Sequence, residues 1–232
     1  MENNKKEMGT TIISFYNPHT GSWFLGADTQ VTEGSHRIMP DKLCKIFEVD
    51  NNILCSGTGS VSDISNIIKK VLRGKRIEKA MADNLDFKIN FKEFVNEISE
   101  LLFDYRRSAY ANEINCNYLT IGYDELEKTT KCYSLSSDGA LMEIKSFYSD
   151  GSGGDFAISQ LNNLWVEIET KPKSDLEVGE ILYEAISQTS TLDLFTNACP
   201  DIFIMKKDGT KEIFIPEDIL SEIEKEKQEV VK

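Results

Sequence analysis

Histidine is scarce in this chain of 232 residues, which contains only two. They are His19 and His36, and neither stands in a spacing typical of metal ligands, so a zinc site is not expected. A Ser-His-Asp or Cys-His enzyme needs a well-placed imidazole as its base, so the shortage argues against both classes. His19 lies within Asn-Pro-His-Thr-Gly, a run typical of a turn. We predict no metal and no other cofactor.

Cysteine pairs and long hydrophobic runs are missing as well. The five cysteines are odd in number, without CxxC spacing: Cys44, Cys55, Cys116, Cys132 and Cys199. No hydrophobic run approaches the roughly 18 residues of a membrane span. The first nine residues are polar and charged, unlike a secretory signal, and we interpret residues 1–9 as a short leader that is removed. These features predict buried thiols in a reducing compartment and a cytoplasmic location.

Positive charge is in deficit, with 26 basic against 39 acidic residues and a net charge of −13. Nucleic acid and anionic membranes attract basic patches, so neither is expected as a partner. We interpret the acidity as a solubility feature. With 40% apolar residues the chain can bury a substantial core. Its length suits one domain, without an internal repeat or a low-complexity segment.

The spacing of apolar residues predicts one domain over residues 10–215, followed by a charged and helical tail over residues 216–232. Strands are expected at residues 10–16, 22–28, 42–49, 52–55, 116–123, 130–136, 141–147, 201–205 and 212–215. Helices are expected at about 60–71, 90–111, 155–168 and 175–190, with a loop at 29–41 and a polar linker after 76. This order predicts an α+β fold, a four-layer αββα sandwich of two stacked, mostly antiparallel sheets flanked by helices.

The step Gly9-Thr10-Thr11, ahead of a β-branched run, has a chemical interpretation. Cleavage between Gly9 and Thr10 would give Thr10 a free α-amine beside its own hydroxyl. Such an amine titrates near pH ~7.7–8.0 and can activate the hydroxyl as a nucleophile. The alternative is an ordinary start of a strand, because Thr and Ile favour strands anyway.

Three other features also have two interpretations. Asp28 ends an apolar strand, either as a solvent-facing terminus or as a placed carboxylate. Lys45 lies among apolar residues, either on an exposed face or in a dry cleft that lowers its pKa. The glycine cluster at 151–154 precedes a helix and suits either a tight turn or the binding of an oxyanion.

Six short motifs, taken in order, resemble those of an archaeal-like β-type subunit of the 20S proteasome, in the N-terminal-nucleophile hydrolase superfamily. They are Gly9-Thr10-Thr11-Ile12, Ala27-Asp28-Thr29, Lys45-Ile46-Phe47, Gly57-Thr58-Gly59-Ser60-Val61-Ser62-Asp63, Gly151-Ser152-Gly153 and Asp193-Leu194-Phe195-Thr196. No motif is specific alone, and their shared order carries the resemblance from Gly9 to about Ile215. The resemblance implies the N-terminal-nucleophile hydrolase fold and a threonine-type endopeptidase.

The resemblance also implies roles for single residues. Thr10 would be the nucleophile, with its own α-amine as base after self-cleavage of the Gly9–Thr10 bond. Lys45 would lower the pKa of the Thr10 hydroxyl, and Asp28 would hold Lys45 charged and oriented. Three further residues would surround the Thr10 amine: Ser152, Asp193 and Thr196.

Substrate contacts are implied in the same way. The amide of Gly59 would form the oxyanion hole, and Thr32 would hold the substrate backbone as an added strand. The pocket for the residue before the cut would be lined by Val31, Leu43, Cys55, Gly57, Val61 and Ser65. Gly57 would form the floor of a deep pocket, and Ser65 stands where an acidic residue would be needed for basic substrates. The hypothesis is a preference for large apolar residues.

The sequence departs from the family pattern at several points. Thr196 replaces the more usual Ser, and Gln30 stands where Arg is common. The first hairpin is two residues longer than usual, with one more residue between Asp28 and Lys45. Because none of these departures removes a reacting group, we expect an active subunit.

Two alternatives remain beside a catalytic proteasome subunit. One is a structural β-subunit without activity, and the other is the simpler bacterial two-ring peptidase driven by its own ATPase. The resemblance implies heptameric β-rings capped by α-subunit rings, and it leaves open whether other β-subunits share the ring. It also implies an ATPase regulator acting through the α-rings, and unfolded polypeptide as substrate.

Overall fold

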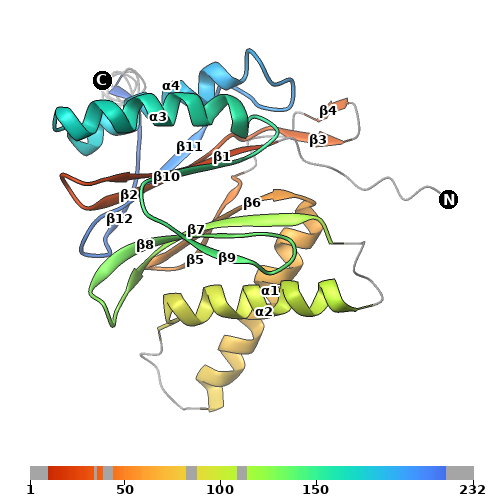
Figure 1. Ribbon diagram of the computed structural model, residues 1–232. Helices are drawn as coiled ribbons and strands as arrows, with labels where there is room; N and C mark the ends of the chain where they lie inside the picture. Colours follow the sequence, from red (N-terminus) through yellow and green to blue (C-terminus); the bar gives the residue numbers. More distant parts are fainter. Residues whose placement is uncertain (1–9, 34–35, 39–43, 82–87, 109–113, 218–232) are drawn as a thin grey trace, which may run out of the picture.

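Two five-stranded antiparallel sheets stack face to face, and helices cover both outer faces (Figure 1). The computed structural model describes residues 10–33, 36–38, 44–81, 88–108 and 114–217; for residues 31–33, 36–38 and 79–81 it describes the backbone alone. The α+β sandwich expected from the order of strands and helices is confirmed.

The first sheet has the strand order β10-β1-β2-β11-β12. Its strands are β1 (Thr11–Asn17), β2 (Ser22–Ala27), β10 (Phe147–Gly151), β11 (Asp201–Met205) and β12 (Lys211–Ile213). Successive side chains of a strand point to opposite faces. In β1, Ile13 and Phe15 therefore face the helices while Ile12 faces the second sheet.

The second sheet is a meander in which consecutive strands pair, in the order β5-β6-β7-β8-β9. Its strands are β5 (Ile46–Asp50), β6 (Ile53–Gly59), β7 (Cys116–Asp124), β8 (Thr129–Leu135) and β9 (Leu141–Ile144). A separate two-stranded ribbon joins β3 (Val31–Glu33) to β4 (His36–Ile38).

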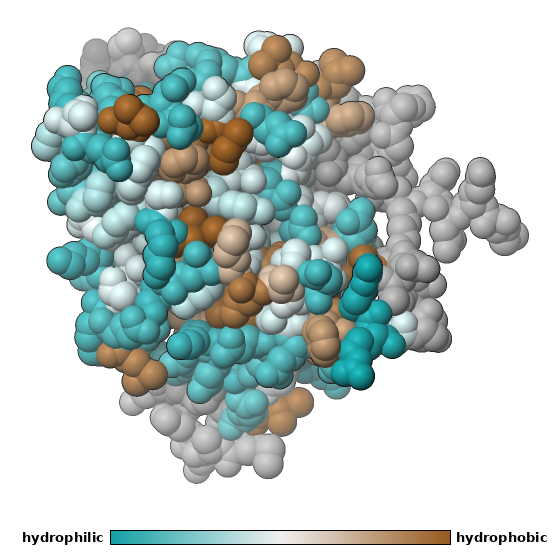
Figure 2. Space-filling view, viewed as in Figure 1, coloured by the Kyte–Doolittle hydropathy of each residue, from teal (hydrophilic) through white to brown (hydrophobic). Residues whose placement is uncertain are grey.

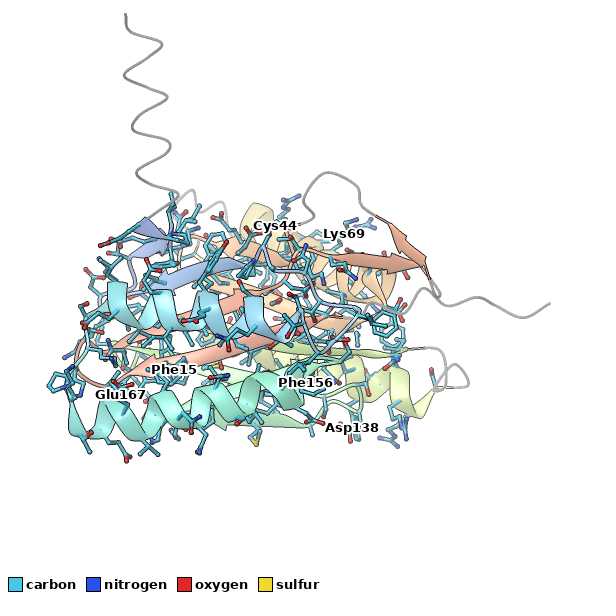
Figure 3. The ribbon with its side chains drawn as sticks, turned by 90° about the horizontal axis from the view of Figure 1, so that it is seen from above. Phe15, Cys44, Lys69, Asp138, Phe156 and Glu167 are labelled. Atoms are coloured by element: carbon cyan, nitrogen blue, oxygen red, sulfur yellow. The ribbon has the colours of Figure 1, made fainter. Side chains whose placement is uncertain are left out.

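Four helices form the outer layers: α1 (Val61–Met81), α2 (Phe91–Arg107), α3 (Gly154–Thr170) and α4 (Asp175–Thr189). The pair α1 and α2 covers the second sheet, and α3 with α4 covers the first (Figure 1). Seen from above, α3 and α4 run side by side, and Phe15 lies beneath them with its ring 5.9 Å from that of Trp165 (Figure 3). Ser174 begins α4 with a capping box that includes Glu177.

The apolar side chains form three cores, one between the sheets and one under each pair of helices. Each fully buried large side chain contributes about 1.5–3 kcal/mol to folding. On the face seen in Figure 2, hydrophobic residues reach the surface in separate small groups among hydrophilic ones. Among the described helices, none is both long and apolar enough to cross a bilayer.

The structure differs from the predicted elements in four places. Residues 29–41, expected as a loop, contain β3 and β4. Helix α1 continues to Met81 through the segment after residue 76, which was expected as a polar linker. Glu78 of this segment pairs with Lys75 one turn before it. Strand β6 extends over 56–59, beyond the strand expected at 52–55. Strand β10 was not predicted, because its polar edge sequence lacks apolar alternation. Of the tail predicted as helical, residues 218–232 lie outside the described part.

Removing a ring from the core under α1 and α2 should lower stability strongly. Phe94 on α2 is fully buried, while Phe103 on the same helix is 49% exposed. We expect Phe94→Ala to lower the free energy of unfolding by about 3–5 kcal/mol, because it leaves a cavity. Phe103→Ala should lower it by less than about 1 kcal/mol. Urea unfolding of the isolated subunit measures both, and equal losses would contradict the assigned core.

Candidate active site

Thr10 immediately precedes β1 and lies against the end of β10. The next residue, Thr11, pairs with Gly151 across these two strands, and Thr10 itself is fully buried. Gly151 has a φ of +93°, and a Cβ at this position would lie 1.9 Å from the carbonyl oxygen of Thr10. Only glycine permits both this backbone conformation and this approach. Gly151 thus allows β10 to close over Thr10.

Lys45, just before β5, reaches Thr10 from the second sheet. Its Nζ donates to Thr10 Oγ1 at 3.0 Å and to Asp28 Oδ1 at 2.8 Å. The side chains of Lys45 and Asp28 are 1% and 0% exposed. Burial lowers the pKa of the Lys45 ammonium, and the attraction of Asp28 opposes this shift. A cation held dry beside a hydroxyl favours ionisation of that hydroxyl.

Asp28, the residue after β2, is held by the backbone as well as by Lys45. Its carboxylate accepts from the amides of Thr11 and Gln30, each at 2.9 Å. Burial raises the pKa of Asp28, while Lys45 and these two amides oppose the rise. The hydrogen bonds fix the carboxylate in place, so Asp28 is a placed carboxylate and not a solvent-facing strand end.

A second group of side chains lies on the nitrogen side of Thr10. The nitrogen of Thr10 donates to Ser152 Oγ at 3.2 Å. Ser152 Oγ and Thr196 Oγ1 both donate to Asp193 Oδ2, at 2.6 and 2.7 Å. Thr11 Oγ1 lies 2.7 Å from Thr196 Oγ1. These contacts join β1 to the start of α3 and to the segment after α4.

The direction of each hydrogen bond in this group follows from counting protons. A carboxylate only accepts, so Ser152 and Thr196 each give their single hydroxyl proton to Asp193. Thr196 Oγ1 can then only accept from Thr11, and Ser152 Oγ can only accept from the nitrogen of Thr10. Ser152 therefore accepts a hydrogen bond from the nitrogen of Thr10 and makes no contact with a lone pair on that nitrogen.

Gly59 ends β6 close to the same point. Its φ is +97°, and a Cβ would lie 2.1 Å from the carbonyl oxygen of Asn115, so this position requires glycine. A Cβ on Gly151 would lie 3.2 Å from the Thr58 methyl group as well as against the Thr10 carbonyl. The end of β6 and Thr10 thus both lie against Gly151.

A small pocket opens beside Lys45, with a volume of about 70 Å³. Its lining residues are Cys44, Lys45, Phe47, Gly57, Val61, Ile64 and Ser65. Apart from Lys45 and Ser65 these side chains are apolar or absent. Ile64 packs closely against Gly57, since a Cβ on Gly57 would lie 3.0 Å from it. The pocket suits an apolar side chain next to the hydroxyl of Thr10.

The predicted pocket residues lie in different places. Gly57, Val61 and Ser65 line the pocket. Cys55 was assigned to it incorrectly, since it is fully buried in the core under α1 and α2, where its sulfur accepts from Thr120. It lies two residues before Gly57 in β6 and does not line the pocket. Gly9, Leu43 and the side chains of Val31 and Thr32 lie outside the described part of the chain.

Several residues of the site were not predicted. Thr11 and Gln30 act through the hydrogen bonds described above, which depend on pairing between distant segments. Gly153 is required because a Cβ there would lie 2.0 Å from Thr11 Oγ1. For Thr11, the signal available in the sequence was a polar side chain within an apolar strand. Among the described residues no group of three or more His, Cys, Asp or Glu could hold a metal ion.

Comparison with known proteins adds a family to this geometry. The family described as Proteasome: Proteasome subunit matches residues 7–205. The chain belongs to the proteasome subunit family. It is 28% identical over 195 residues to "Proteasome subunit beta" of Nanoarchaeum equitans, covering 82% of this chain and 91% of that protein. It is 24% identical over 189 residues to "Proteasome subunit beta 1" of Thermococcus kodakarensis, covering 81% and 85%. The family of β-subunits is a peptidase family.

In this proteasome-family chain, loss of Lys45 should cost more stability than loss of another shielded lysine. Lys45→Met leaves Asp28 buried without its cation, and we expect the free energy of unfolding to fall by about 3–5 kcal/mol. The control is Lys75→Met: Lys75 is 6% exposed, but its partners Glu78, Glu93 and Glu97 are 56%, 64% and 34% exposed and can turn to water. Its loss should cost about 1 kcal/mol or less. Urea unfolding at neutral pH compares the two, and an equal or smaller loss for Lys45→Met would contradict this account.

Proposed function

We propose that this chain is a catalytic β-subunit of a 20S proteasome-like particle, a threonine endopeptidase whose nucleophile is Thr10. The observation that carries the proposal is the convergence of two groups on one residue. Lys45 donates to the hydroxyl of Thr10 while Ser152 takes its N–H. The proposal includes removal of residues 1–9 by self-cleavage between Gly9 and Thr10.

The reaction follows from these contacts once Thr10 has a free amine. Ser152 accepts one N–H, so the lone pair of the amine is free to take the hydroxyl proton. Lys45 stabilises the alkoxide, which attacks the carbonyl carbon of the scissile peptide bond. The amide of Gly59 is proposed to donate to the tetrahedral oxyanion, a contribution often worth ~3–4 kcal/mol.

The second half of the reaction returns the enzyme to its starting state. The protonated amine of Thr10 gives its proton to the leaving nitrogen as the peptide bond breaks, and an ester remains on Thr10. Water, deprotonated by the same amine, then attacks the ester. The bond to Thr10 Oγ breaks, the amine returns the proton to this oxygen, and the acid product leaves. Asp193 and Thr196 keep Ser152 oriented throughout.

The alternatives are less well supported. A structural subunit has no need of a lysine buried beside a threonine hydroxyl, since such burial costs stability. A bacterial two-ring peptidase would share the fold, but the relatives are archaeal proteins named proteasome subunit beta and are matched over most of their length. Retention of all reacting groups supports a catalytic subunit.

Assembly is part of the proposal. A peptidase active as a free monomer would digest the cell, so the site must be enclosed. We propose heptameric β-rings, with or without other β-subunits, capped by α-subunit rings in a cytoplasmic particle. An ATPase regulator would act through the α-rings and deliver unfolded polypeptide. The names of the archaeal relatives support membership of such an assembly.

Replacing the nucleophile should block both processing and hydrolysis. In the assembled particle we expect intact mass to show loss of residues 1–9 in the wild type and their retention in Thr10→Ala. Hydrolysis of fluorogenic peptides should fall by at least ~10³-fold. Thr10→Ser, which keeps the hydroxyl, serves as the control and should retain processing. A wild-type particle that keeps its leader and is inactive would instead favour the structural subunit.

The pocket beside Lys45 generates a separate expectation about specificity. Its apolar lining and about 70 Å³ of space should favour Leu or Tyr before the cut over Arg or Glu, by about tenfold or more in kcat/KM. Ser65→Asp should raise the relative rate for Arg by placing a carboxylate in the pocket. Ser62→Asp, in the same turn of α1 outside the lining, is the matched control. A clear preference of the wild type for Arg would overturn this assignment.

A further inference from the structure

Asp150, in β10, connects the two sheets beside the active site. Its Oδ2 accepts from Thr58 Oγ1 and from Asn117 Nδ2, each at 2.9 Å. Its Oδ1 accepts from the amide of Gly151 at 2.7 Å. Thr58 in β6 and Asn117 in β7 stand directly opposite each other in the second sheet. One carboxylate of the first sheet thus holds a cross-strand pair of the second.

Asp150 and its partner Thr58 each lie within two residues of a proposed active-site group. Asp150 is two residues before Ser152, which binds the nitrogen of Thr10. Thr58 is one residue before Gly59, the proposed oxyanion donor. Strands β10 and β6 belong to different sheets and share no backbone ladder. The side chain of Asp150 therefore joins the two segments that must stand at a fixed spacing around Thr10.

A sandwich can slide by small amounts, since the contacts between its sheets are mostly apolar and lack direction. Hydrogen bonds to a carboxylate are directional and roughly twice as strong as neutral ones. Thr58 is 5% exposed, so its hydroxyl has little water to replace the bond to Asp150. This bond thus fixes the end of β6 more strictly than packing alone does.

We propose that Asp150 is a positioning residue for the reaction, which holds the Gly59 amide in register with the nucleophile Thr10. The proposal rests on the proposed function. Displacement of a reacting group by about 1 Å can cost about 10²-fold in rate. Asp150 touches neither Thr10 nor the oxyanion site, so its loss should affect the transition state more than the binding of substrate.

The test uses the assembled particle and a fluorogenic peptide. Asp150→Ala should lower kcat by about 10–100-fold and change KM by less than about threefold. Thr58→Val, which keeps the shape and removes the hydroxyl, should give a smaller loss of the same kind. The double variant should be no slower than Asp150→Ala, because both changes remove one connection. Asp150→Asn keeps one acceptor oxygen and should recover part of the rate.

A second readout separates positioning from general damage. In a peptide vinyl sulfone, Thr10 Oγ adds to the vinyl carbon β to the sulfonyl group, the C=C π bond opens, and the hydroxyl proton passes through the amine of Thr10 to the α carbon. This addition forms no tetrahedral oxyanion. The labelling rate should stay within about threefold of the wild type in Asp150→Ala, whereas a damaged site would lose labelling and hydrolysis together. Asp138→Ala is the matched control: Asp138 accepts from a serine hydroxyl and a backbone amide in the β8–β9 turn (Figure 3). It should change neither rate.

The outcomes distinguish this inference from the function on which it rests. An active wild type with full kcat in Asp150→Ala and Thr58→Val overturns the role of Asp150 alone. Parallel losses of labelling and hydrolysis in Thr58→Val, the milder variant, also overturn it, since they indicate structural damage. A wild-type particle that is neither processed nor active overturns the proposed function and this role with it.

Discussion

The buried ion pair between Asp28 and Lys45 is the constraint from which the geometry of the site follows. Asp28 directly follows a strand of the first sheet and Lys45 directly precedes a strand of the second, so the pair fixes one sheet against the other. Two desolvated charges tolerate little displacement, because each has lost the water that could replace its partner. Thr10 Oγ1 accepts a hydrogen bond from the same Lys45 Nζ, so the pair also fixes the position of this hydroxyl.

The sandwich explains how residues far apart in the sequence meet at Thr10. Every segment that reaches it lies at the end of a strand or a helix. Asp28 follows β2, Ser152 follows β10, and Asp193 follows α4. Stacked sheets with outer helices bring such ends together at one edge while their apolar middles form the three cores. Folding stability and the site thus use different parts of the same elements.

How much could be predicted depended on whether a feature is local. Strands such as β1 and β7 follow from their apolar, β-branched runs, and α2 from its helical stripe. Strand β10 was missed because an edge strand needs no apolar alternation, as its residues Tyr148, Ser149 and Asp150 show. Segment 56–59 lacked strand character because its small residues serve the close approach of α1, not local propensity.

For the site, motif resemblance pointed to six residues that the structure brings together, and their catalytic roles stay predictions. Thr11 and Gln30 were missed because their contributions are single hydrogen bonds that depend on tertiary pairing. Cys55 was misplaced because it shares a strand face with Gly57, while its burial under α1 and α2 is set by helix packing. Strand periodicity predicts which way a side chain points, but not what covers it.

The hydroxyl network shows why residue types alone do not define such a site. Ser152, Thr196 and Thr11 could each donate or accept, and only the carboxylate of Asp193 gives the set one direction. Fixing that direction makes Ser152 an acceptor toward the nitrogen of Thr10. In the proposed cleaved form, the free amine of Thr10 would present its lone pair to its own hydroxyl, whose other neighbour is the ammonium of Lys45. Ser152 accepts a hydrogen bond from the nitrogen of Thr10, and the Lys45 cation lies beside its hydroxyl. Together they polarise Thr10 in the direction that a nucleophile needs.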